Sequence, residues 1–202
     1  RGELYRITHI NISLCYPGLS KEEQEKLANE SVVETFISGY ESMLSWSRPI
    51  HISGSRIFKI ENNYLLSRNI KNNNGLIVIA IHNRSVDMLL KWINSKSKTT
   101  SLYKKIKNKR LNEFVRKERK KNNNEIYETS VGGVRKIFKS LLSNNVICLA
   151  ADQVPQAGMG EYVNFFDREA YTTTLASSLA YKTGKPVIYC SMNSNNKNNL
   201  FV

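Results

Sequence analysis

The pattern in this chain of 202 residues with the clearest capacity for chemistry is a histidine followed five residues later by an aspartate, His82 and Asp87. An imidazole held by a carboxylate keeps one ring nitrogen protonated and leaves the other free to accept a proton, so such a pair can activate a hydroxyl. Five residues of regular helix turn through about 500°, which would leave the two side chains about 140° apart. They can meet only if His82 lies in the turn before a helix and Asp87 in its first turn.

The neighbouring elements predict that placement. The apolar run 76–81 directly before His82 is typical of a buried central strand, and a helix is expected over 86–94. An aspartate in a first turn is also favoured by the helix dipole. The alternative is a histidine at a strand end beside a capping aspartate, with no role in chemistry.

The remaining pattern alternates between strands and helices. A capping box from Ser20 to Glu23 predicts a helix start. The stripe behind it is expected to be core or a face resting on a membrane; it contains Val33, Phe36, Ile37, Tyr40 and Leu44. Further strands are expected over 56–60, 99–103, 125–128, 146–151 and 186–191, and further helices through Tyr64 and Leu66 and over 108–121, 131–142 and 172–182.

This alternation predicts one α/β domain over residues 1–202, an α/β/α sandwich with a largely parallel central sheet. The chain begins without Met, and its last three residues have the pattern of a strand. We therefore expect a fragment that lacks both ends.

Positive charge is concentrated in one part of the chain. Of a net charge of +13, the stretch 91–121 contributes +11, from thirteen Lys or Arg and two Glu. Such a stretch is either a solvated helix face or a docking surface for anionic headgroups, substrate phosphates or an acidic carrier. The three cysteines are widely spaced in apolar contexts, so neither disulfides nor a zinc site is expected.

Five blocks, taken in order, resemble the late lipid A acyltransferase branch of the glycerolipid acyltransferase superfamily. The first, 6–17 followed by 19–23, resembles the segment after that branch's membrane helix. The second, 81–87, resembles the His-x4-Asp/Glu signature. The others are the helix 131–135 running into the strand 146–153, the pair 163–167 and 170–174, and the strand 183–188. The second signature position is aspartate here, whereas the branch usually has Glu. In this respect the sequence is closer to that of the phospholipid-making relatives.

The resemblance implies transfer of a fatty acyl chain from acyl carrier protein, or less readily from coenzyme A, to a hydroxyl of a lipid A precursor. His82 would take the acceptor proton, and Asp87 would fix the tautomer and stabilise the imidazolium. No metal or redox cofactor is implied. An N-terminal membrane helix, an anionic membrane surface as partner, and action at the cytoplasmic face of the bacterial inner membrane are also implied.

The resemblance also suggests substrate-binding residues. Arg119 is expected near the site, although Arg116 can align there instead. Asp152 and Gln153 match a strand-end Asp-Gln pair, with local structure as the alternative role for Asp152. Phe165 and Phe166 are expected either to be core or to form the wall of an acyl groove. Thr172 and Thr173 are expected at a helix start whose free backbone amides can bind phosphate.

Two other functions remain open. The stretch 83–85 favours an acyltransferase acting on lysophosphatidic acid in phospholipid synthesis. The basic stretch 91–121 favours a non-enzymatic nucleic-acid-binding domain. Against the latter, the sequence has no RNA-binding aromatic motif, no zinc-finger spacing and no recognition helix, so we expect no nucleic-acid partner.

Overall fold

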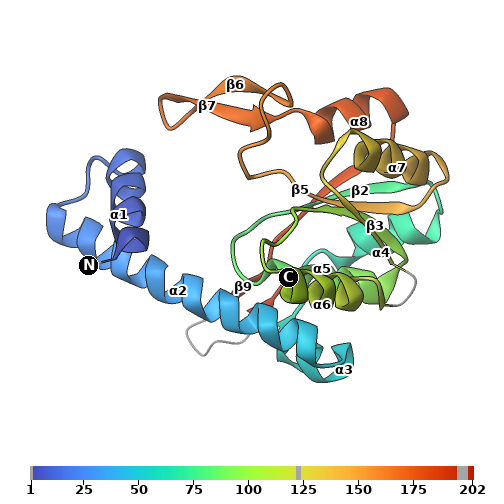
Figure 1. The fold of residues 1–202 in the computed structure, drawn as a ribbon, viewed down its shortest axis with the longest axis horizontal. Coiled ribbons are helices and arrows are strands. Elements are labelled where there is room, and N and C mark those ends of the chain that lie inside the picture. The colour runs from blue at the N-terminus through green and yellow to red at the C-terminus, as the bar shows by residue number, and fades with distance from the viewer. Residues whose placement is uncertain (1, 122–123, 195–199) are drawn as a thin grey trace.

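The centre of the protein is a sheet of five parallel strands, in the order β4-β3-β5-β2-β8 (Figure 1). The computed structural model describes residues 2–121, 124–194 and 200–202. The strands are β2 (Leu76–Ala80), β3 (Thr99–Tyr103), β4 (Glu125–Glu128), β5 (Val146–Ala150) and β8 (Val187–Cys190). All five were expected from the sequence, and the predicted parallel arrangement is confirmed.

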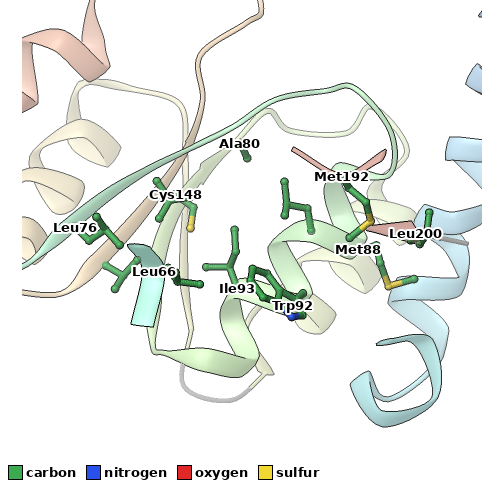
Figure 2. Close-up of a cluster of buried hydrophobic side chains, with 12 residues drawn as sticks. Leu66, Leu76, Ala80, Met88, Trp92, Ile93, Cys148, Met192 and Leu200 are labelled. Carbon is green, nitrogen blue, oxygen red and sulfur yellow. The ribbon is translucent and has the colours of Figure 1, made fainter. Parts of the chain in front are cut away.

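Helices cover both faces of this sheet, because its two central strands are apolar on both sides. Alternate residues of β2 and β5, such as Val78 and Cys148, pack against α4 (Asn63–Lys71) and α5 (Val86–Lys96) (Figure 2). The residues between them, such as Ile79 and Leu149, pack against α7 (Val131–Leu142) and α8 (Leu175–Thr183). The expected α/β/α sandwich is therefore confirmed.

The N-terminal part is a helical hairpin that projects from the sandwich (Figure 1). It joins α1 (Glu3–Cys15), which the sequence did not predict, to the long helix α2 (Lys21–Ser47). The predicted capping box is confirmed: the backbone N–H of Glu23 donates to the Ser20 hydroxyl over 3.2 Å, and the backbone N–H of Ser20 donates to the Glu23 carboxylate over 2.8 Å. α3 (Ile50–Ser53) and the short η1 (Gly54–Arg56) follow.

The apolar stripe of α2 is largely not core. Val33, Phe36 and Tyr40 are exposed, whereas the far end of α2 packs against α5 and α6 (Lys109–Arg119). Leu44, the last residue of the stripe, packs against the core cluster, whereas the earlier part of α2 extends beyond the sandwich (Figure 1). None of the described helices combines the length and apolarity that a membrane crossing requires.

Two smaller sheets complete the fold. One contains β1 (Ile57–Lys59), β10 (Leu200–Phe201) and β9 (Asn193–Ser194). The other is a hairpin of β6 (Gly160–Phe165) and β7 (Arg168–Thr173) that the sequence did not predict. The predicted helix start at Thr172 is wrong, because Thr172 and Thr173 pair with β6 and α8 begins only at Leu175. β-branched residues such as threonine pack well in strands, which explains this outcome.

The close contact between α7 and the sheet yields a stability prediction. A Cβ at Gly133 would lie 2.1 Å from the Glu128 carbonyl oxygen, whereas at Gly132 the nearest atom would be 3.8 Å away. Gly133→Ala must therefore displace α7, and we expect it to lower the free energy of unfolding by about 1–3 kcal/mol. Gly132→Ala should leave it unchanged or slightly higher. Urea denaturation of both variants measures the difference, and equal values would contradict this packing.

Candidate active site

The register of the two central strands brings a histidine and an aspartate together. Ala80 of β2 pairs with Ala150 of β5, and His82 and Asp152 each lie two residues beyond that pair. Oδ1 of Asp152 is 2.7 Å from Nδ1 of His82, and Oδ2 accepts the backbone N–H of His82 over 2.7 Å. One carboxylate therefore fixes both the ring and the main chain of His82.

The opposite ring nitrogen faces an amide side chain and solvent. Nε2 of Gln153 lies 3.4 Å from Nε2 of His82, and the His82 side chain is 33% exposed. With Nδ1–H donated to Asp152, Nε2 is left as the proton acceptor. The arrangement is a base held by a carboxylate, and it lies where a substrate can reach it.

The pKa of Asp152 fits this role. Partial burial favours the protonated form, but the hydrogen bonds from the ring and the backbone of His82 outweigh burial and hold the pKa of Asp152 below its ordinary value. The carboxylate is therefore ionised at neutral pH and can support a positive charge on the ring.

Asp87 lies where the sequence placed it but has a different partner. It is in the first turn of α5, whose cap is Ser85, accepting the backbone N–H of Met88 over 3.3 Å. Its side chain is 8% exposed, and Oδ1 accepts Nε and Nη2 of Arg119 over 2.8 and 2.5 Å. In the described part of the chain, the hydrogen bonds of the His82 ring go to Asp152 and Gln153 rather than to Asp87.

The other predicted residues fall into two groups. Asp152 and Gln153 contact the His82 ring, whereas Arg119, rather than Arg116, contacts Asp87 and makes no hydrogen bond to that ring among the described residues. Phe165 and Phe166 are 61% and 48% exposed at the hairpin tip, so their interpretation as core is wrong. The backbone there has positive φ at Phe166 and Asp167, which directs the chain through a tight turn.

One hollow includes His82 in its lining, and a second includes its neighbour Gln153. The first, of about 360 Å³, lies between α2 and the turn after β2. Most of its lining residues have polar side chains, and the full lining is Ser31, Glu34, Thr35, Ser38, Gly39, Ser42, His82, Asn83, Arg84 and Val86. The second, of about 210 Å³, is more apolar and includes Gln153, Leu102, Leu149, Val154 and Leu175. It shares Leu175 and Met159 with an apolar groove of about 670 Å³ between α7 and α8.

The lowered pKa of Asp152 yields a pH prediction. A carboxylate whose pKa is lower in the folded state stabilises the fold above its unfolded pKa, and the stabilisation is lost as pH falls through the folded value. Wild-type protein should therefore exceed Asp152→Asn in melting temperature at pH 6, with the difference shrinking at pH values below about 4. Thermal melts from pH 3 to 6 measure this, and a difference that grows toward acid would contradict it.

Comparison with known protein families shows the family to which the chain belongs. No curated protein matches the chain. The family model described as bacterial lipid A biosynthesis acyltransferase matches residues 2–201. That range includes the strand ends that carry His82 and Asp152, both hollows, and helices α1 to α8. The chain therefore belongs to the bacterial lipid A biosynthesis acyltransferase family, whose activity is acyl transfer in lipid A synthesis.

Proposed function

We propose that the protein transfers a fatty acyl chain from an acyl carrier protein thioester to a hydroxyl of a lipid A precursor. The observation that carries this proposal is that His82, with its Nδ1 held by Asp152, lines a hollow rich in polar side chains and contacts Gln153, which lines a more apolar hollow. A hydroxylated headgroup suits the polar side, where four Ser and Thr hydroxyls line α2. An acyl chain suits the apolar side, which continues between α7 and α8.

The proposed reaction needs one base and one polar contact. Nε2 of His82 takes the proton of the acceptor hydroxyl as its oxygen attacks the thioester carbonyl carbon. Asp152 stabilises the imidazolium, and we assign the Gln153 amide, 3.4 Å from Nε2 of His82, as the donor to the developing oxyanion. The C–S bond then breaks, the ester forms, and the departing thiolate takes the proton from His82. The thioester supplies an activated acyl group, so no metal or redox cofactor enters this scheme.

Asp87 then acts through Arg119 rather than through the ring. The buried carboxylate and the guanidinium fix the start of α5 to α6, and α5 follows directly after the turn that carries His82. We assign this pair to support of the turn and Asp152 to the orientation of the base.

The partner and location follow from two exposed features. Most cations of the stretch 91–121 face solvent on and around α6, and they suit an acidic carrier or anionic headgroups. Exposed apolar side chains occupy the hairpin tip and α2, including Phe36 and Phe165. Exposed apolar side chains of this kind suit contact with a lipid surface. These features favour action at an anionic membrane surface, and the family implies that this surface is the cytoplasmic face of the bacterial inner membrane.

The acceptor assay tests the reaction. Full-length protein in detergent is given lauroyl or myristoyl carrier-protein thioester with a lipid A precursor or with lysophosphatidic acid, in parallel with His82→Ala. We expect transfer to the lipid A precursor and a loss of about 10²–10⁴-fold in His82→Ala, because a positioned base contributes about that factor. Transfer only to lysophosphatidic acid would move the protein to phospholipid synthesis. Full activity of His82→Ala would refute the base.

A second comparison separates the two carboxylates. Asp152→Asn keeps the shape but favours the wrong tautomer, so kcat should fall at least about 10²-fold, alongside the loss of melting temperature expected from the lowered pKa of Asp152. Asp87→Asn should instead lower the free energy of unfolding by about 2 kcal/mol, since it weakens a charged hydrogen bond to Arg119. If Asp87→Asn loses kcat while its stability is unchanged, Asp87 and not Asp152 orients the base.

A further inference from the structure

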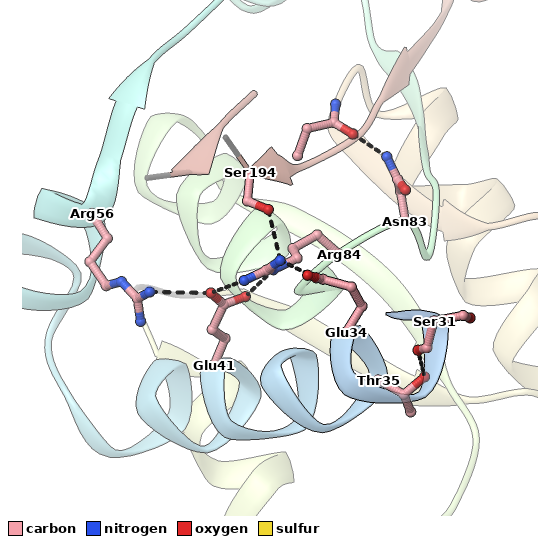
Figure 3. A network of polar contacts seen from close by, with 9 residues as sticks. Ser31, Glu34, Thr35, Glu41, Arg56, Asn83, Arg84 and Ser194 are labelled. Atoms are coloured by element: carbon pink, nitrogen blue, oxygen red, sulfur yellow. Dashed lines mark hydrogen bonds and ion pairs between the residues drawn. The ribbon is translucent and has the colours of Figure 1, made fainter. Parts of the chain in front are cut away.

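The turn that carries His82 is tied to helix α2 by a buried ion pair. Arg84 donates from Nε to Oε2 of Glu41 over 3.1 Å and from Nη2 to Oε1 over 3.3 Å (Figure 3). The Arg84 side chain is 3% exposed, and that of Glu41 is fully buried. The planar guanidinium and the carboxylate thus meet as two parallel forks, which fixes their relative orientation as well as their distance.

The rest of the guanidinium is occupied too. Nη1 donates to the carboxylate of Glu34, about two turns before Glu41 on α2, and to the hydroxyl of Ser194 on β9 over 2.7 Å (Figure 3). Four of the five N–H groups of Arg84 therefore have partners within the protein. Although Arg84 borders the polar hollow, it has little left to offer a substrate.

The same helix holds the far end of this segment. The Ser45 hydroxyl of α2 donates to the Asp87 carbonyl oxygen over 3.1 Å in a buried contact. Arg84 and Asp87 thus fasten both parts of the segment 82–87 to α2, while the ring of His82 is held by Asp152 at the end of β5. The distance between the base and the hydroxyl-lined wall of α2 is set by these attachments.

A buried ion pair contributes geometry more dependably than it contributes stability. Removing two charges from water is costly, and apolar side chains of similar volume often stabilise a protein as well or better. We propose that Arg84 is a positioning residue. Through Glu41 and Glu34, it fixes His82 relative to the α2 wall of the polar hollow, where the acceptor hydroxyl is proposed to bind. This inference rests on the proposed acyl transfer and adds a residue to it.

The first test compares two arginines that share one carboxylate. Arg56 donates from Nη2 to Oε1 of Glu41 over 3.3 Å, but it comes from η1 and is 31% exposed. Arg84→Lys keeps the positive charge but loses the two parallel hydrogen bonds to Glu41. We expect kcat to fall up to about 100-fold, with little change in the KM for the thioester or for the lipid acceptor. Arg56→Lys perturbs the same carboxylate and should keep kcat near that of wild-type protein. Equal kcat values for the two variants would overturn the proposal.

A double variant separates the effect of the ion pair on kcat from its effect on stability. Arg84→Met combined with Glu41→Leu replaces the ion pair by apolar groups of similar size, and its melting temperature should approach the wild-type value. We expect kcat to remain low in this double variant, because the directional contact is absent. A wild-type kcat in the double variant would show that apolar packing in place of the Arg84–Glu41 ion pair is sufficient, and it would overturn the proposal.

A third measurement does not depend on acyl transfer. Diethyl pyrocarbonate modifies imidazoles, and mass spectrometry reports His82 separately from His9 and His51. In Arg84→Lys, modification of His82 should be faster than in Arg56→Lys, with His9 and His51 unchanged. If wild-type protein transfers no acyl group but this difference is found, the proposed function fails and the positioning role stands. If transfer occurs and the His82 rates are equal, the positioning role fails alone.

Discussion

The candidate site depends on the register between strands β2 and β5. These strands run parallel with Ala80 opposite Ala150, so the residues two positions further on, His82 and Asp152, leave the sheet side by side. A shift of one residue would turn every side chain of a strand to the other face. The alternate packing of β2 and β5 against two different sets of helices prevents such a shift. The same hydrophobic pattern that builds the core thus delivers a carboxylate to the imidazole.

The turn after β2 then has three kinds of support. The sheet holds the ring of His82 through Asp152, α6 holds Asp87 through Arg119, and α2 holds Arg84 through Glu41. Each support comes from a part of the chain distant in sequence. An exposed base on a turn would otherwise sample several orientations, and a misplacement of about 1 Å can reduce a rate about 100-fold. The buried charges around this turn are consistent with a need for fixed geometry.

The sequence was sufficient for the elements of the sandwich and for the residues of the site, but not for their pairing. The apolar pattern located β2 and α7 closely, because β2 is a continuous buried apolar run and α7 buries one regular face. The partner of His82 could not be found by spacing along the chain, since it lies seventy residues away at the end of another strand. The signal available was that His82 and Asp152 both directly follow apolar runs. Parallel strands place such positions at one edge of the sheet.

Core was one of two alternatives for the stripe on α2 and for Phe165 and Phe166, and it is wrong for most of these residues for a common reason. The stripe on α2 and the pair Phe165 and Phe166 have the composition of core, but both lie on parts that project from the sandwich (Figure 1). Periodicity identifies an apolar face and does not identify what covers it. The prediction for Thr172 and Thr173 is wrong for a different reason: the sequence of the paired strands β6 and β7 does not alternate regularly between apolar and polar residues.

The central claim is that Asp152 fixes the tautomer of His82 so that Nε2 is the base. Nitrogen-15 NMR of the histidine side chains measures this directly, with His82 assigned by comparison with His82→Ala. In the neutral ring, we predict a protonated Nδ1 and a bare Nε2 in wild-type protein and in Asp87→Asn, and loss of this preference in Asp152→Asn. A neutral ring protonated at Nε2 in wild-type protein, or one that responds to Asp87→Asn and not to Asp152→Asn, would contradict the account.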